Sequence, residues 1–357
     1  MNYNNTYYVF KNTYSKRRLD FYHPPIGYRG VSEGVGGRRG DREGRGVVTS
    51  LAYVHKAPDD LTPTSGETTM ASEVPEIIDV HCHVVSPDRV AYPLAPLGGK
   101  QSDWSSERPT TPEQLLAAMD EAGVTKAAVV QASTAYGHDS SYLADSLKHA
   151  PARFTGVFSI DPLDPRALDH MDHWTSLGMT GMRVFTTGST MPGQQTWLDD
   201  ERAWPVWEKA GALRLPVAMQ MTAEGIPLLL KIVRAFPNVN FLLDHLARPV
   251  INDGPPYAAA ASLWSLAEHK NIYLKLTSRT VEHCQAGKAT PQTFMPQLVA
   301  AFGSDHILWG SNFPAHDDTL ANIVRETLHV LEPLSPADRA NILSGTARRL
   351  YPTLAQA

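Results

Sequence analysis

From Glu76 onward, short apolar runs alternate with longer amphipathic stretches along the chain. The apolar runs have strand length and read IIDVHCHV, KAAVVQAS, FTGVFSI, GMRVF, PVAMQM, VNFLLDH, IYLKLT and HILWG. Helix-like stretches lie between them, at 112–122, 141–149, 201–211, 226–235, 291–301 and 320–331. Eight apolar runs with intervening helices predict an α/β fold of the (β/α)8 TIM-barrel type, followed by an extra helix at the C-terminus.

Local signals support two of the helix starts. Thr111 precedes Pro112 and has Gln114 three positions on, and Ser335 precedes a proline in the same way, with an aspartate three positions on. A doubly wound open sheet is the alternative fold, but no glycine-rich phosphate loop follows any of the apolar runs. We therefore assign residues 71–357 to one barrel domain.

Residues 1–70 have a different composition, with a Tyr/Asn-rich start and a Gly/Arg-rich run from Gly27. Such a segment buries too little apolar surface to offset chain entropy, so we expect disorder. It is either a nucleic-acid-binding or targeting tail, or a dispensable leader with Met70 as an alternative start. We favour the leader, because Met70 directly precedes the first patterned segment.

The overall composition narrows the protein class. The chain has 357 residues, 42% of them hydrophobic, a formal net charge of −5 and two cysteines, Cys82 and Cys284. The charge offers no basic face for nucleic acid, no apolar run is long enough to span a membrane, and two cysteines form no disulfide scaffold. We expect a cytoplasmic protein with a small anionic substrate and with neither a nucleic-acid nor a membrane partner. The oligomeric state stays open.

Unusual polar residues follow the apolar runs. In a (β/α)8 barrel the catalytic groups lie at the C-terminal ends of the strands, so this placement predicts a common site. The residues in question, in strand order, are His81, His83, Gln131, Ser133, Tyr136, His138, Asp139, Asp161, Arg183, Gln220, His245, Arg248, Lys275, Ser311, Asn312, His316 and Asp317.

Alternation along the first strand separates its polar residues. Asp79, His81 and His83 share one face, and Cys82 lies on the other. If the first face lines the barrel, both imidazoles project into the pocket and Cys82 packs against helices. Cys82 is then a buried thiol rather than a nucleophile.

Three motifs identify a family resemblance. DVHCH in the first strand, DHLARP after the sixth and WGSNFP after the eighth resemble the amidohydrolase superfamily, of the amidohydrolase 2 type. The segments VVQASTAYGHDSSYL and LGMTGMRVF are similar to its 2-pyrone-4,6-dicarboxylate lactonase branch, so the resemblance covers residues 76–352. It implies a (β/α)8 barrel that carries out hydrolysis at a strand-end site.

The resemblance also implies roles for individual residues. His81, His83 and His245 take the positions that ligate a divalent metal, Zn or Mn, in metal-using members and polarise the substrate carbonyl directly in others; both remain open here. Asn312 takes the position of the aspartate that accepts a proton from water, although an amide has no basicity near neutral pH. The alternative proton acceptors are His316, Asp317, His138 and Asp139.

Two arginines indicate the substrate. Arg183 and Arg248 either bind a substrate carboxylate, as in the resembling lactonases, or pair with structural aspartates such as Asp161 or Asp244. Ser133, Tyr136, His138 and Gln131 are expected to add hydrogen bonds to the substrate, and Trp104 or Phe313 a flat wall. The predicted function is hydrolysis of a carboxylated lactone or similar cyclic ester. The alternatives are a decarboxylase, a lactone isomerase and a non-hydrolytic binding barrel.

Overall fold

The computed structural model describes residues 75–187 and 193–356. The predicted leader, residues 1–70, lies outside the described residues, so its expected disorder stays a prediction. The strands are β1 (Ile77–Cys82), β2 (Val124–Val130), β3 (Phe154–Ser159), β4 (Gly181–Phe185), β5 (Val217–Gln220), β6 (Phe241–Leu243), β7 (Ile272–Thr277) and β8 (Ile307–Gly310).

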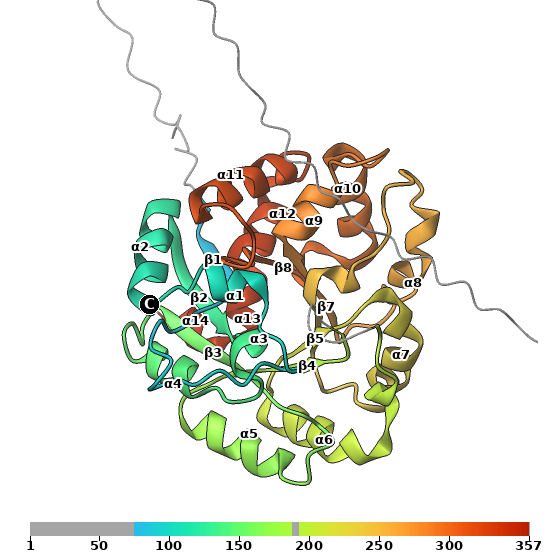
Figure 1. Cartoon of the computed structure of the whole chain (residues 1–357). Coiled ribbons are helices and arrows are strands. Elements are labelled where there is room, and N and C mark those ends of the chain that lie inside the picture. The colour runs from blue at the N-terminus through green and yellow to red at the C-terminus, as the bar shows by residue number, and fades with distance from the viewer. Residues whose placement is uncertain (1–74, 188–192, 357) are drawn as a thin grey trace, which may run out of the picture. The chain divides into compact units, whose positions relative to one another are not determined.

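Helices follow the strands around the outside of the sheet (Figure 1). Within the described ranges, no helix has the length and apolar character needed to cross a membrane. The α-helices are α1 (Asp103–Glu107), α2 (Pro112–Ala122), α3 (Ser133–Tyr136), α4 (Ser141–Leu147), α5 (Ala167–Ser176), α6 (Trp204–Leu213), α7 (Ile226–Ala235), α8 (Ala261–Trp264), α9 (Ser278–His283), α10 (Pro291–Phe302), α11 (Leu320–Leu331), α12 (Pro336–Ala340), α13 (Thr346–Leu350) and α14 (Pro352–Ala355).

The strands form a parallel sheet in chain order, from β1 to β8. Beyond the last residue of β8 the chain returns to β1: Asn312 N donates to His81 O at 2.6 Å, and His83 N donates to Phe313 O at 2.8 Å. Gly310 makes this approach feasible, because a Cβ at that position would lie 2.5 Å from the Cβ of His81. The predicted (β/α)8 barrel is confirmed.

Two apolar layers hold the barrel together. The larger one lies between the strands and the surrounding helices, and the smaller one fills the barrel interior with residues such as Val80, Val130 and Leu242. The C-terminal segment completes the interior layer with Leu350 of α13 and Tyr351. The extra C-terminal helix predicted from the sequence is thus a set of short helices that closes one end of the barrel and leaves the strand C-termini for the site.

The helix signals read from the sequence are largely confirmed. Thr111 and Gln114 form the capping box of α2, with Thr111 Oγ1 accepting from Gln114 N at 3.3 Å and Gln114 Oε1 from Thr111 N at 2.9 Å. Helices α7 and α11 have the predicted bounds. The stretch 201–211 differs: a 3-10 turn at Glu201–Ala203 comes first, and α6 begins only at Trp204.

Candidate active site

The end of β1 carries an irregularity that aims its histidines. Asp79 pairs with Ala127 and Cys82 with Val129, so three steps along β1 face two steps along β2. The extra residue is a β-bulge, which interrupts the alternation of side chains. Val80 belongs to the interior layer, whereas Cys82 packs in the outer layer against the helices. The expected orientation of Cys82 is confirmed, and burial raises the pKa of its thiol well above the ordinary value.

Asp79, which alternation placed on one face with His81 and His83, has a structural role. Its Oδ1 accepts hydrogen bonds from His81 N and from Ser311 N, each at 2.9 Å. Asp79 is fully buried, and burial raises its pKa. The carboxyl group therefore ties β1 to the residue after β8 instead of facing a substrate.

His83 lies in the pocket wall with its ring held from one side. Its Nδ1 lies 2.8 Å from the carbonyl oxygen of Val130, and the ring of Trp104 packs over it with centroids 5.2 Å apart. Burial, followed by the positive charge of Arg183, lowers the pKa of His83 to about 3. The imidazole is therefore neutral at physiological pH.

His245 reaches the same pocket from a sharp turn after β6. The apolar run predicted a strand that ends at His245, whereas β6 ends at Leu243. Residues 245–248 all have positive φ, at 55°, 54°, 56° and 55°, and form a left-handed turn. His245 Nδ1 lies 2.7 Å from Thr277 Oγ1 of β7. Burial lowers the pKa of His245 to about 3, with Asp244 opposing the shift and Arg183 adding to it. Backbone strain of this kind is tolerated where it positions functional groups.

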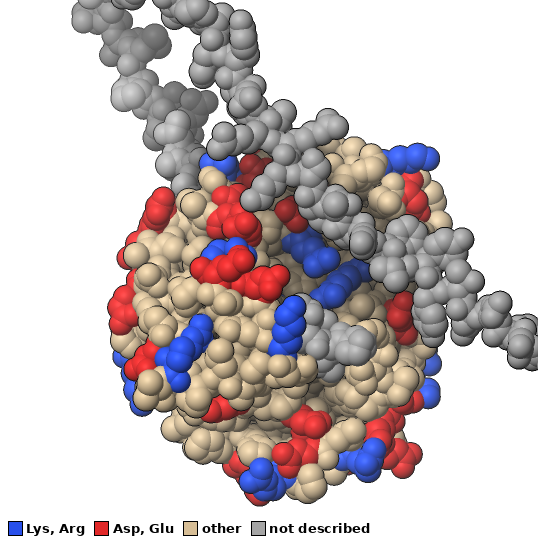
Figure 2. Space-filling view, viewed as in Figure 1, with Lys and Arg blue, Asp and Glu red and all other residues tan. Residues whose placement is uncertain are grey.

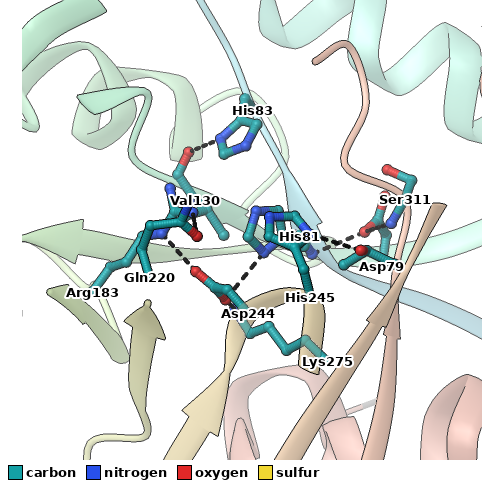
Figure 3. Close-up of polar contacts among 11 residues, drawn as sticks. Asp79, His81, His83, Val130, Arg183, Gln220, Asp244, His245, Lys275 and Ser311 are labelled. Carbon is teal, nitrogen blue, oxygen red and sulfur yellow. Dashed lines mark hydrogen bonds and ion pairs between the residues drawn. The ribbon is translucent and has the colours of Figure 1, made fainter. Parts of the chain in front are cut away.

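A buried charge cluster lies below these imidazoles (Figure 3). Asp244, fully buried, is 2.8 Å from Arg183 Nε, 3.2 Å from Lys275 Nζ and 3.3 Å from His81 Nδ1. Burial alone would raise the pKa of Asp244, but the charges of Lys275 and Arg183 hold it well below its ordinary range. Arg183 Nη2 also donates to Gln220 Oε1 at 3.2 Å. The cluster thus fixes a carboxylate between two cations.

His81 belongs to this cluster rather than to the pocket surface. Its side chain is fully buried, and its ring lies 5.1 Å from that of His83 and 5.0 Å from that of His245, measured between centroids. Burial lowers its pKa well below the ordinary value. The rings of the two pocket histidines therefore lie against the buried ring of His81.

The pocket at the strand ends has a volume of about 190 Å³. Two neutral imidazoles and three guanidinium groups surround it, and basic side chains are visible near the middle of the face drawn in Figure 2. The described lining residues are His83, Leu97, Trp104, Gln131, Ala132, Ser133, Thr134, Arg183, Phe185, Gln220, His245, Arg248, Arg279, Asn312 and Ala315.

Both substrate arginines expected from the sequence line this pocket. Arg183 is nearly fully buried and pairs with the structural Asp244. It also lines the pocket, so the two roles that were weighed as alternatives do not exclude each other. Burial lowers the pKa of Arg248, and the charges of Arg279 and Arg183 lower it further. Arg279 also lines the pocket, although the sequence-based prediction did not include it. Its position two residues after the end of β7 is the feature of the sequence that indicates a place at the strand ends.

The remaining expected substrate contacts divide into two groups. Ser133 and Gln131 line the pocket and are both almost completely buried. Tyr136 instead accepts a hydrogen bond from Ser86 N at 2.8 Å. His138 lies in a separate pocket that includes Asp161, with its Nδ1 2.8 Å from Ser159 Oγ.

The expected proton acceptors are not brought to the pocket. His316 lies 3.8 Å from Glu282 and faces another depression, and the exposed Asp317 lies 3.3 Å from Arg108. Asp139 is exposed, and its Oδ1 accepts a hydrogen bond from Ser141 N at 3.0 Å. Like His138, these residues lie outside the described lining.

Asn312 and two aromatic side chains form the rest of the pocket wall. Asn312 lines the pocket from a left-handed backbone position with φ of 61°. Trp104 and Phe185 supply the aromatic wall, whereas Phe313 packs against the outer apolar layer. The sequence-based choice of Trp104 thus agrees with its place in the pocket, and Phe313 has a structural position.

The site residues do not fit a divalent metal ion as they stand. No group of three His, Cys, Asp or Glu side chains in the described part of the chain is arranged to hold one. His81, the central expected ligand, directs Nδ1 at Asp244, and the charges of Arg183 and Lys275 lie within the same cluster. Like charges at short range in a buried site oppose a further cation.

Comparisons with known proteins agree with this architecture. A model of the amidohydrolase family matches residues 78–353. An L-fucono-1,5-lactonase of Burkholderia ambifaria is 28% identical over 121 residues, 33% of this chain and 41% of that protein. The chain thus aligns with less than half the length of this curated relative.

Solved structures share the fold at low sequence identity. Two are of proteins whose names propose 2-pyrone-4,6-dicarboxylic acid hydrolysis: one from Pseudomonas putida (22% identity, TM-score 0.62, 78% of this chain and 98% of that one) and one from Acinetobacter baumannii with citric acid bound (17%, 0.62, 78% and 99%). An amidohydrolase of Burkholderia multivorans with bound zinc is 19% identical, with TM-score 0.62 over 78% and 99% of the two chains.

Proposed function

The chain belongs to the amidohydrolase family, and from this membership and the geometry of the pocket we propose that it hydrolyses a carboxylated lactone or similar cyclic ester. The observation that carries the proposal is the convergence of Arg183, Arg248 and Arg279 with the neutral rings of His83 and His245 on one strand-end pocket. The names of the lactonase and hydrolase relatives support the same reaction class.

The arginines favour an anionic substrate. Guanidinium groups bind carboxylates through paired hydrogen bonds, and Arg183 is already oriented by Asp244 and Gln220. A pocket of about 190 Å³ is smaller than the roughly 300–1,000 Å³ typical of drug-sized ligands. A single ring that carries carboxylate groups suits both properties.

The uncharged donors of the pocket then act on the ester carbonyl. His245 follows β6 and Ser133 follows β2, and both side chains line the pocket. Ser133 Oγ is buried and has no hydrogen-bond partner within the described residues, so its hydroxyl is available to donate a hydrogen bond to a substrate oxygen. Donors aimed at a developing oxyanion are worth about 3 kcal/mol of barrier each.

A panel of carboxylated lactones and their uncharged methyl esters tests the proposal. Acid release measured in a pH-stat should occur with the carboxylated lactones, and the methyl esters should react at least ten-fold more slowly, roughly the worth of one charged hydrogen bond. The product formed in H₂¹⁸O should carry one ¹⁸O atom. Loss of CO₂ without ring opening would instead show a decarboxylase, ring rearrangement without ¹⁸O an isomerase, and tight binding without turnover a binding barrel.

A further inference from the structure

A second depression lies between α9, α11 and the segment that joins β8 to α11. Helices α9 and α11 pack against each other at this place (Figure 1). The depression, called here the α9–α11 depression, has a volume of about 140 Å³. Its described lining residues are Ser278, Val281, Glu282, Gln285, His316, Asp318, Ile323 and Glu326.

The lining of the α9–α11 depression is acidic. It contains the carboxylates of Glu282, Asp318 and Glu326, and neither lysine nor arginine occurs among its described residues. His316 Nε2 lies 3.8 Å from Glu282 Oε1, and Glu326 lies 3.8 Å from Arg325, whose side chain is largely exposed. Carboxylates gathered in one depression repel each other and attract a cation.

Ser278 gives an independent indication that a ligand binds here. Its side chain belongs to the lining and is 2% exposed, and its Oγ has no hydrogen-bond partner within the described residues. A buried hydroxyl without a partner costs free energy, and native structures leave few of them. A polar ligand in the depression would supply the missing partner.

From the carboxylates and this hydroxyl we infer that the α9–α11 depression binds a small primary alkylammonium ion. An ammonium group has three N–H donors and no acceptor, so it matches a lining rich in acceptor oxygens. Gln285 Nε2 donates to Val281 O at 3.0 Å, which leaves Gln285 Oε1 as a further acceptor. Val281 and Ile323, each 3% exposed, offer apolar surface to the alkyl chain. The inference goes beyond the proposed function and does not depend on it.

A metal ion matches this lining less well than an ammonium ion. Within the described ranges, no three His, Cys, Asp or Glu side chains are arranged to hold one. Asp318 Oδ1 already accepts from Thr319 N and from Asn322 Nδ2, each at 2.7 Å. Hydrogen bonds from an ammonium group span roughly 2.7–3.2 Å, whereas Ca²⁺ and Mg²⁺ need oxygens at roughly 2.0–2.6 Å. The ammonium ion therefore needs less convergence of the carboxylates.

The α9–α11 depression adjoins two segments of the catalytic pocket. Ser278 lines the depression, and the next residue, Arg279, lines the catalytic pocket. In the segment after β8, His316 N donates to Asn312 O at 2.8 Å, and Asn312 lines the catalytic pocket. A bound ammonium ion would therefore connect the start of α9 with the segment after β8, next to the catalytic pocket.

An NMR titration of the whole chain with propylammonium chloride tests the inference. The salt replaces sodium chloride at constant ionic strength, so that general screening does not change. Backbone amide signals of residues 278–285 and 316–326 should shift to saturation, with a Kd on the order of 1 mM because exposed carboxylates are weak partners. Tetramethylammonium has no N–H donor and should bind roughly ten-fold more weakly or worse, and uncharged propanol should leave these signals unchanged.

Variants of the lining locate the bound ion. Ser278→Ala should raise the Kd roughly five-fold, without lowering the free energy of unfolding in the absence of amine, because the lost hydroxyl had no partner. The double variant Glu282→Gln with Glu326→Gln should abolish saturable binding. The matched control is Glu113→Gln, because Glu113 is exposed on α2 and outside the described lining, and it should retain the wild-type Kd.

Several outcomes would overturn the inference. They are the absence of saturable shifts at these amides, equally tight binding of tetramethylammonium, and an unchanged Kd in Ser278→Ala. Tighter binding of Mg²⁺ or Ca²⁺ at the same amides would make the depression a metal site instead. None of these results bears on lactone hydrolysis, since the titration uses no substrate.

Discussion

Arg183 Nε lies 2.8 Å from Asp244 Oδ2 in the interior of the barrel, and both side chains are almost completely excluded from water. The same carboxylate lies 3.2 Å from Lys275 Nζ. An arginine of the pocket lining is thus held by a carboxylate that the chain places next to His245 in sequence. Arg183 and the buried His81 ring therefore share one buried carboxylate, that of Asp244.

Asp244→Asn should strongly destabilise the fold, because it leaves two buried cations without a counter-charge. Breaking a buried ion pair on one side costs about 3–5 kcal/mol in the free energy of unfolding. Urea denaturation followed by circular dichroism measures the change. The matched control is Asp199→Asn, since Asp199 pairs with the exposed Lys231, and the loss there should be about 1 kcal/mol or less. Equal losses in the two variants would contradict the anchoring role.

Lys275→Met should cost less stability than Asp244→Asn. The methionine side chain is one heavy atom shorter than that of lysine and carries no charge, and Arg183 continues to neutralise Asp244 at 2.8 Å. The catalytic effect should exceed the structural one, with kcat lowered more than KM is raised, because His81 loses part of the fixed charge pattern around Asp244. Thermal unfolding measures the loss of stability, and steady-state kinetics measures the loss of kcat. A variant less stable than Asp244→Asn would show that Lys275 itself is the anchor.

The stability of the protein should fall as the pH drops from about 6.5 toward 3. His83 and His245 each have a folded-state pKa of about 3, against an ordinary value of 6.5. Between these values the unfolded chain binds protons that the folded chain does not, so each histidine lowers stability by about 1.4 kcal/mol per pH unit. Above pH 6.5 neither contributes a pH dependence.

Urea denaturation at pH 7 and pH 5 measures this dependence. Replacing both histidines with glutamine should reduce the difference between the two pH values, and the buried His81 accounts for part of what is left. Replacing the half-exposed His329 should leave the difference as in wild type. An unchanged slope in the double variant would show that the two rings are not buried in neutral form.

Much of the fold and part of the site follow from sequence because they depend on local patterns. The apolar runs, the capping box at Thr111 and the strand-end polar residues all have such signals. The inward aim of His83 also came out as predicted, but a β-bulge between Asp79 and Cys82 is part of the cause. Bulges depend on the partner strand, so alternation along one strand cannot reveal them.

What the sequence could not supply is the relative placement of loops. His138 and Tyr136 belong to the same strand-end segment as Ser133, yet they lie elsewhere, because α3 turns them away from the pocket. Arg279 enters the pocket because β7 ends at Thr277 and the chain then turns into α9. Such positions follow from helix geometry at the barrel rim, which no periodicity in the sequence encodes.

Activity should be independent of divalent metal ions. The cluster of Arg183, Lys275 and Asp244 already places two positive charges beside His81, and a third cation there would be repelled. Dialysis against a chelator should change kcat less than two-fold, and added zinc or manganese should not raise it. Elemental analysis of protein prepared without chelators is the independent check. One equivalent of bound metal together with chelator inactivation would contradict this prediction.

Arg279→Gln should weaken substrate binding without slowing the chemical step. Arg279 lines the pocket but is exposed, in contrast to the buried Arg183, and its charge acts on Arg248. Losing one charged hydrogen bond to a carboxylate should raise KM about ten-fold, with kcat changed less than two-fold. The uncharged methyl ester should show no such increase. Arg325→Gln, on the exposed side of α11, should leave both constants unchanged. If the methyl ester responds as strongly as the acid, Arg279 acts through pocket shape and not through charge.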